Sequence, residues 1–149
     1  MNRCLTAIFV ALALLPGLSA HAQTKVIKGR SQYGEVLYNF DGEYLRAGTS
    51  VYSEVLFNWD GEFIRSGRSR YGEVLYNFDG RNFRQGQSRY GKVLFNWDGE
   101  FIRMGESRYS DPLYNFDGQY LRSGRSRYST ELLNISGKLP VALLIFLLM

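Results

Sequence analysis

The chain has 149 residues, of which 45% are hydrophobic, and 18 basic against 14 acidic residues give it a formal net charge of +4. This length suits one domain and is short for two. The arginines are spread through the chain without a basic block, so the composition gives no sign of nucleic-acid binding.

The first 22 residues have the pattern of a secretory signal peptide. A short positive region at residues 2–3 precedes an apolar stretch at residues 4–18, and Ala-His-Ala at residues 20–22 forms a small-residue cleavage site. We therefore expect an exported protein, periplasmic, cell-surface or secreted, whose mature chain begins near Gln23.

The only cysteine and the only histidine, Cys4 and His21, lie in this segment. The mature chain would then contain no thiolate and no imidazole, which excludes disulfides, zinc sites built on Cys or His, and nucleophiles activated by His. An enzyme would depend on carboxylates alone. The sequence therefore predicts no catalytic residues, no metal site and no cofactor.

Residues 23–137 are predicted to form a domain of repeats. Units follow each other with a constant period of nineteen residues, and the sixth is incomplete. A fixed period of this length is typical of repeat proteins, in which each unit is one supersecondary element that cannot fold alone. The units begin at Ser31, Ser50, Ser69, Ser88, Ser107 and Ser126.

Each unit has the pattern of a β-hairpin. In the first unit, residues 35–40 (EVLYNF) and 43–48 (EYLRAG) are runs rich in aromatic and branched residues, joined by Asp-Gly. No window of the repeat shows an apolar pattern at helical spacing. The repeat domain is therefore predicted to contain strands without helices.

Two turn geometries give the hairpin different faces. A two-residue turn at residues 41–42 puts Leu37 on the same face as Asn39, whereas a three-residue loop at residues 40–42 makes Leu37 face Leu45. The first of these positions is Leu in every unit, and its proposed partner is always apolar. We therefore favour the three-residue loop, with Leu and Ile inward and Tyr, Phe and Arg outward.

The two ends of the array complement each other. The sixth unit has a first strand at residues 131–135 without a clear second strand, and residues 25–30 resemble a second strand without a first. The N-terminal strand can complete the last hairpin, and closure would remove exposed strand edges. We predict an all-β fold, a closed ring or shallow barrel of about six β-hairpins.

Residues 138–149 form an apolar C-terminal tail that does not follow the repeat. After Lys138 the sequence is LPVALLIFLLM, which is too short to cross a bilayer as a helix. The favoured interpretation is a buried closing segment. Shallow association with a membrane and a divergent or frame-shifted end are the alternatives.

The hairpin pattern resembles a known family. Residues 25 to about 137 largely follow L-[YF]-N-[FW]-D-G-x-x-[LI]-R-x-G-x-S-x-Y, which is similar to the short hairpin repeats of β-flower proteins. The resemblance implies hairpins arranged as petals of a shallow, nearly symmetrical barrel, with no settled activity. Choline-binding repeats of bacterial surface proteins rank second, because the tryptophan pair expected at the start of that repeat is missing.

The β-flower shape in turn resembles the barrel of Tubby-type domains, an analogy at the level of the fold that suggests lipid head groups as one ligand class. A Tubby-type domain has a central helix. This chain departs from that pattern unless its apolar tail supplies the helix.

Two sets of recurring residues are candidate ligand-binding sites. Aromatic residues at the turn tips would lie along one rim, where they could stack on sugars or enter a membrane interface, or else would fold onto the neighbouring hairpin as core. Arginines of the second strand could surround an anion such as lipid phosphate or acidic glycan, or else form a structural ladder on aromatics or Glu. The aromatic set is Phe40, Trp59, Phe78, Trp97 and Phe116, and the arginine set is Arg46, Arg65, Arg84, Arg103 and Arg122.

The acidic residues of the turns give weaker signals. Asn39 and Asp41 offer two side-chain oxygen donors per turn, whereas Ca²⁺ takes about six to eight oxygen ligands. Asn and Asp are also the residues that such a turn favours. Paired carboxylates for glycoside cleavage would have to come from different hairpins, and nothing singles out one pair.

The favoured function is therefore an exported, non-enzymatic module at the cell envelope that binds a glycan or a lipid surface, or serves as a structural element, through many weak and equivalent sites. The alternative is a membrane-associated, lipid-binding module that uses the apolar tail and the rim aromatics. A hydrolase that uses carboxylates alone is the least favoured function.

Overall fold

The computed structural model describes residues 23–149. The predicted signal peptide, with Cys4 and His21, lies outside the described residues. The described chain consists of short strands followed by one helix, α1 (Val141–Leu147). The strands are β1 (Thr24–Lys28), β2 (Val36–Phe40), β3 (Tyr44–Ala47), β4 (Phe57–Trp59), β5 (Phe63–Ser66), β6 (Val74–Phe78), β7 (Asn82–Gln85), β8 (Val93–Trp97), β9 (Phe101–Met104), β10 (Tyr114–Phe116), β11 (Tyr120–Ser123) and β12 (Glu131–Ser136).

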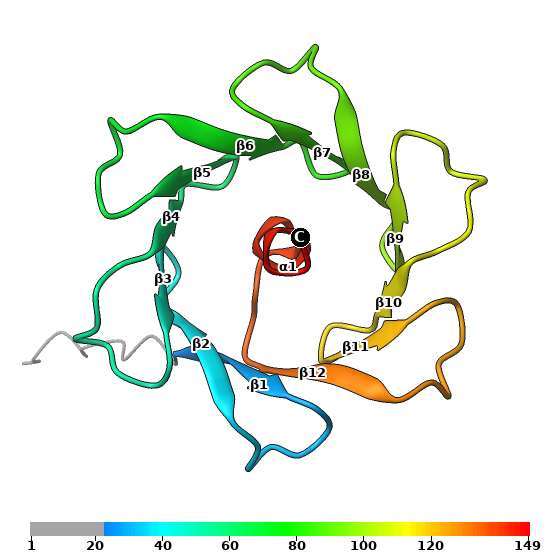
Figure 1. Ribbon diagram of the computed structural model, residues 1–149, viewed down its shortest axis with the longest axis horizontal. Helices are drawn as coiled ribbons and strands as arrows, with labels where there is room; N and C mark the ends of the chain where they lie inside the picture. The colour runs from blue at the N-terminus through cyan, green and yellow to red at the C-terminus, as the bar shows by residue number, and fades with distance from the viewer. Residues whose placement is uncertain (1–22) are drawn as a thin grey trace, which may run out of the picture.

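The strands form a closed antiparallel barrel in which sequence neighbours are also neighbours in space. β1 closes the ring because it pairs with β12 on one side and with β2 on the other. Pairs such as β3 and β4 are joined by loops that point outward like petals, whereas β2 and β3 are joined by a tight turn (Figure 1). The predicted ring, with the N-terminal strand completing the last hairpin, is confirmed.

The apolar tail forms the centre of the ring. α1 lies on the barrel axis, surrounded by the strands (Figure 1), and Leu143 and Leu144 are 0% exposed. Pro140 stands at the N-cap, a position at which the missing amide costs no helical hydrogen bond. The predicted buried segment is therefore confirmed, and the alternative of a tail resting on a membrane is wrong because its apolar side chains already face the barrel wall.

The hairpin register differs from both geometries considered for the sequence. Phe40 pairs with Leu45 and Asn39 with Arg46, so four residues, 41–44, separate the paired positions. The Asp41 carboxylate determines this geometry, because its Oδ1 accepts the N–H groups of Glu43 and Tyr44 at 3.0 and 2.8 Å. The longer loop shifts the strand pairing relative to the three-residue loop. The prediction of a three-residue loop is therefore wrong.

The shift of register changes which side chains face inward. The Leu45 position is buried as predicted, but the aromatic residues of Tyr-Asn-Phe point inward beside it, whereas Leu113 and Leu132 at the Leu37 position are exposed. The rings of Phe57 and Phe146 pack edge to face with centroids 4.6 Å apart. Large side chains are needed here because they must fill the space between the wall of a wide barrel and a single narrow helix.

Candidate functional site

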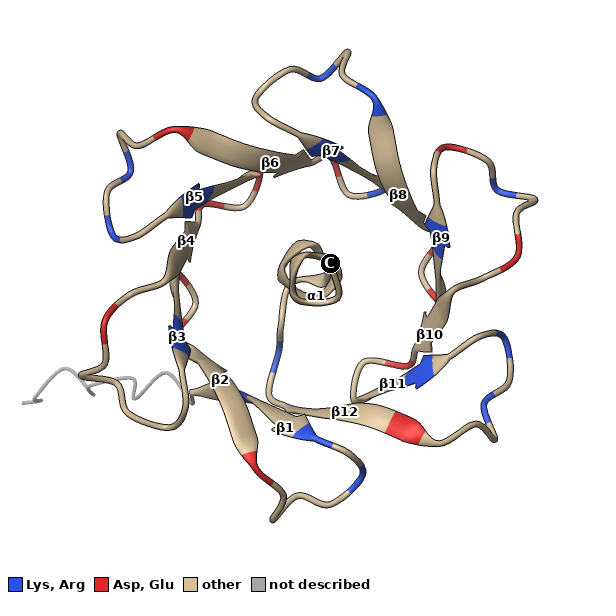
Figure 2. Cartoon of the chain, in the orientation of Figure 1, with Lys and Arg blue, Asp and Glu red and all other residues tan. Residues whose placement is uncertain are grey.

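Two regions of the surface carry repeated polar or aromatic side chains. The turn rim consists of the Asp-Gly turns, which surround the start of α1 at one mouth of the barrel. The petal tips are the outward loops, such as that between β5 and β6 (Figure 1). Basic residues occur in these loops and on the odd-numbered strands, and acidic residues occur both near the turns and in the petal loops (Figure 2).

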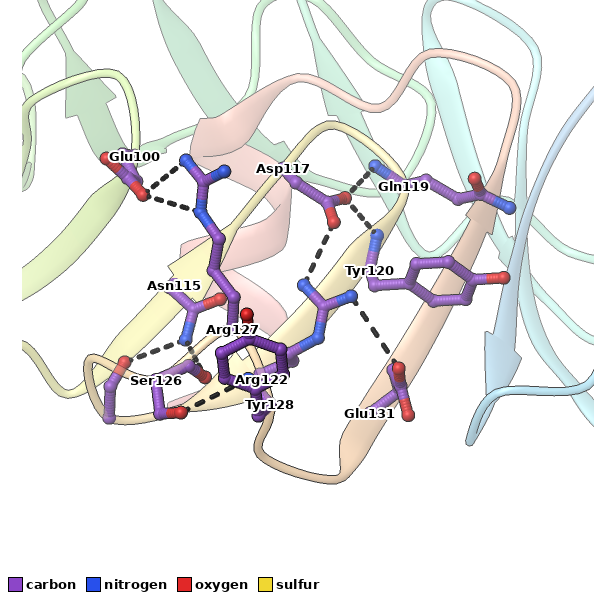
Figure 3. Close-up of polar contacts among 11 residues, drawn as sticks. Glu100, Asn115, Asp117, Gln119, Tyr120, Arg122, Ser126, Arg127, Tyr128 and Glu131 are labelled. Carbon is purple, nitrogen blue, oxygen red and sulfur yellow. Dashed lines mark hydrogen bonds and ion pairs between the residues drawn. The ribbon is translucent and has the colours of Figure 1, made fainter.

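The carboxylate of each turn organises its own hairpin. In the turn of β10 and β11, Asp117 Oδ1 accepts the backbone N–H groups of Gln119 and Tyr120, and Oδ2 accepts a hydrogen bond from Arg122 Nη1 at 2.9 Å (Figure 3). Partial burial by itself raises the pKa of this carboxyl, but the two amides and the guanidinium outweigh burial and hold the pKa below its usual value. The same arrangement recurs at Asp41, Asp60, Asp79 and Asp98.

The predicted arginine set lies in these carboxylate pairs. Arg46 is 5% exposed and bonds Asp41 at 2.8 Å, and its guanidinium lies over the Tyr44 ring at 5.5 Å. This placement matches the structural ladder that the sequence allowed, although the carboxylate partner is Asp rather than Glu. The aspartate of its own turn likewise pairs with each of Arg65, Arg84, Arg103 and Arg122. Arg122 also lies 3.6 Å from Glu131.

An asparagine between the two inward aromatics anchors each petal. Asn96 is 0% exposed, and its Nδ2 donates to the carbonyls of Gly105 and Ser107 at 2.7 and 3.2 Å. The amide therefore fixes the loop that follows the second strand of its hairpin. Equivalent pairs of hydrogen bonds are made by Asn39, Asn58, Asn77 and Asn115.

Clefts lie between neighbouring turns of the turn rim. Two of them have volumes of about 590 and 570 Å³ and reach Val141 at the start of α1. In these clefts an exposed arginine of the next petal reaches back to a turn glutamate, as Arg127 does to Glu100 at 2.7 Å (Figure 3) and Arg89 to Glu62 at 2.8 Å. Each of these ion pairs links the turn of one hairpin to the petal that follows the next hairpin.

The petal tips present a tyrosine in every unit. Tyr71 is 99% exposed, because Ser69 Oγ accepts its backbone N–H at 3.2 Å in a tight turn that directs the side chain away from the barrel. The ring of exposed tyrosines consists of Tyr33, Tyr52, Tyr71, Tyr90, Tyr109 and Tyr128.

The model of the family described as 6-fold beta flower protein matches residues 22–144. The chain belongs to this β-flower family. No curated protein and no solved structure gives a significant match. The resemblance read from the hairpin pattern is thereby confirmed.

The aromatic set predicted from this β-flower sequence does not form an exposed rim. Phe40 and Phe116 are buried at 3% and 6% exposure, and Trp59, Phe78 and Trp97 are half-buried against the core. The two tryptophans nevertheless line clefts of the turn rim. This set therefore belongs mainly to the inner wall, with only the edges of some rings available to a ligand.

The tyrosines at the petal tips of this β-flower were not among the candidate residues predicted from the sequence. The signal was present, because Ser-x-Tyr recurs in all six units without exception, and a Ser that opens a turn predicts an exposed residue two positions later. The aromatic candidates were taken from the Tyr-Asn-Phe and Phe-Asn-Trp segments instead, although the large side chains of these segments fill the core.

Within residues 23–149, no helix combines the length and apolar character needed to cross a membrane. In the same range, no group of three or more Asp, Glu, His or Cys side chains is placed to hold a metal ion.

Proposed function

We propose that this β-flower protein is an exported, non-enzymatic binding module that attaches to a repetitive glycan of the cell envelope through its petal tips. The observation that carries the proposal is the ring of six tyrosines, which are 88 to 100% exposed although Tyr is a residue that folding usually covers in part. Such residues have no role in packing the barrel.

The chemistry of the tips fits a surface partner. Tyrosine offers a flat apolar ring and a hydroxyl at little cost in conformational entropy, and Tyr and Arg are the residues that carry most binding energy at many interfaces. Arg70, Arg89, Arg108 and Arg127 each precede one of these tyrosines. Three of these arginines pair with turn glutamates, so the contact proposed at each tip is the stacking of the tyrosine ring on a sugar.

The six-fold arrangement makes weak contacts effective. One tyrosine on a sugar binds weakly, but several tips on one polymer act as linked sites, which raises the overall affinity by a factor on the order of 10² to 10⁴. The partner should therefore be polymeric, and short fragments of it should bind poorly.

Catalysis has no part in this proposal. The turn aspartates are bound to backbone amides and to arginines, and the pKa of each lies below its usual value, which is the opposite of what a general acid requires. The pKa is lowered at the aspartate of all five turns, so no two carboxyl groups stand out as a catalytic acid and base.

The experiment is retention of residues 23–149 on insoluble envelope glycans, compared with anionic liposomes. The triple substitution of Tyr71, Tyr90 and Tyr109 to Ser should lower retention by about tenfold or more, since linked sites lose more than the sum of single losses. Single substitutions should each have a small and similar effect.

Leu132→Ser with Met104→Ser is the matched control, because both side chains are exposed apolar groups away from the tips. Unchanged retention of the triple tyrosine variant would refute the role of the tips. Flotation with liposomes without retention on glycans would refute the glycan as partner and replace it with lipid.

A further inference from the structure

One cleft of the turn rim differs in charge from three others. In three clefts a turn glutamate pairs with the arginine 27 residues further along the chain: Glu43 with Arg70, Glu62 with Arg89 and Glu100 with Arg127. The third turn carries Arg81 at the glutamate position, and the residue 27 positions later is Arg108. The exchange of one glutamate for arginine therefore puts two cations where the other clefts hold an ion pair.

Both arginines line the same cleft, which has a volume of about 530 Å³. Within residues 23–149, neither of them lies within ion-pair distance of a carboxylate, whereas the three glutamate clefts are each closed by such a pair. The lining residues of this cleft are Gly80, Arg81, Trp97, Asp98, Gly99 and Arg108.

The one acidic group in this lining is already engaged. Asp98 Oδ1 accepts the N–H groups of Glu100 and Phe101, and Oδ2 accepts a hydrogen bond from Arg103. Its negative charge is therefore balanced by a third guanidinium. The charges of Arg81 and Arg108 face the cleft without an internal partner of opposite sign.

A matched cleft two repeat units earlier shows what the exchange changes. It has a volume of about 390 Å³ and contains the equivalent tryptophan, aspartate and glycines, but Glu43 stands in place of Arg81 and bonds Arg70 at 2.8 Å. Its lining residues are Gly42, Glu43, Trp59, Asp60, Gly61 and Arg70. The fold of the two clefts is the same, and their charge differs by two units from this one position.

We propose that the Arg81–Arg108 cleft is a binding site for a phosphate or sulfate ester carried on a sugar. Two guanidinium groups match the oxygens of a tetrahedral dianion through paired hydrogen bonds. Trp97 forms a half-buried aromatic wall of the same cleft, against which a sugar ring can stack. The site is single in the described ring and goes beyond the repeated, equivalent contacts of the petal tips.

Titration calorimetry or NMR of residues 23–149 with glucose 6-phosphate, glucose 6-sulfate, inorganic phosphate and glucose tests this site. The two esters should bind at one site more tightly than inorganic phosphate, glucose should not bind, and added salt should weaken the affinity. Preference for phosphate over sulfate, or the reverse, identifies which ester the site takes. Absence of binding by every anionic probe overturns the proposal.

Arg81→Glu is the decisive variant, because it restores the ion pair found in the three other clefts and should therefore fold. It is expected to weaken ester binding by about tenfold or more, since one guanidinium is lost and the other is neutralised. Arg108→Gln should weaken binding in the same direction. Equal affinity in wild type and Arg81→Glu overturns the proposal.

Glu43→Arg converts the matched cleft into a copy of the proposed site. It should add a second equivalent site, and a stoichiometry that stays at one would contradict the assignment. The triple tyrosine variant of the petal tips should bind the esters as wild type does. The experiments therefore distinguish a failure of the glycan-binding proposal for the petal tips from a failure of the ester-binding proposal for this cleft.

Discussion

The inner wall of the barrel and its outer hydrogen-bond lattice are stabilised in different ways. On the outer side, the hydrogen bonds that organise each turn and its petal join near neighbours in sequence, such as Asp41 with Arg46 and Asn39 with Gly48. On the inner side the aromatics of the first five units form one core cluster with α1, which occurs once and has no repeat. The outer lattice can therefore form hairpin by hairpin, whereas the core requires the last residues of the chain.

The largest effect should come from the centre of the inner wall. Leu144→Ala removes a side chain that is 0% exposed, and we expect the free energy of unfolding to fall by about 2 to 5 kcal/mol. Urea denaturation monitored by circular dichroism measures this change. Met149→Ala, at 58% exposure on the end of the same segment, is the control, and equal losses would mean that the helix does not fill the ring.

The next effect tests the outer lattice. Asn96→Ala leaves the carbonyls of Gly105 and Ser107 without their donor, and we expect a loss of about 1 to 3 kcal/mol in the free energy of unfolding. Asn82→Ala serves as the control, because this half-buried asparagine takes the place of the outward Tyr44 and donates no side-chain hydrogen bond to the petal. A larger loss for Asn82→Ala would contradict the anchoring role.

Acid should weaken the outer lattice while leaving the inner wall intact. The pKa of each turn aspartate is lowered in the folded chain, so the stability that these groups contribute is present above the unfolded value, about 3.9, and is lost as pH falls through the folded value. Unfolding free energy measured from pH 7 to pH 2 should therefore decline below about pH 4.

Asp79→Asn sharpens this test. The variant should be less stable than wild type at pH 7 and should lose less on acidification, because one lowered carboxyl is gone and Arg84 has lost its partner. Identical pH dependence in wild type and variant would show that these pairs do not govern acid unfolding.

The smallest effect is expected at the exposed ion pairs of the turn rim. Glu62→Gln breaks the pair with Arg89, whose side chain is 71% exposed, and an exposed pair contributes little because water and salt screen it. The melting temperature should fall less than in any variant above, and the difference should vanish in about 1 M salt. A loss comparable to that of Asn96→Ala would place the turn rim among the main stabilising regions.

Much of the fold was predictable because the repeat is a local signal. Constant spacing, the Asp-Gly turns and the half units at both ends predict hairpins in a closed ring without any knowledge of long-range contacts. The direction of the side chains was not predictable in the same way. A shift in loop length reverses the faces of a strand, and the bonds of Asp41 to Glu43 and Tyr44 that set the loop are visible only in the folded turn.

The candidate sites show the same division. The recurrence of Arg46 and Phe40 was plain in the sequence, but their burial followed from the register and from the position of α1. The Arg81–Arg108 cleft depends on a turn residue and a petal residue of successive hairpins, which line one space only in the folded ring. The replacement of a turn glutamate by Arg81 points to a site only once the structure shows that this position pairs with the arginine 27 residues later.

The sequence by itself determined the number of hairpins, the closure of the ring and the residues that its turns require, since these depend on short-range geometry that each unit repeats. The tertiary structure alone decided that the aromatics face inward and that Arg81 and Arg108 line the same cleft. The physical reason is that a barrel has an inside only when it is closed, and the burial of each side chain depends on what occupies that inside.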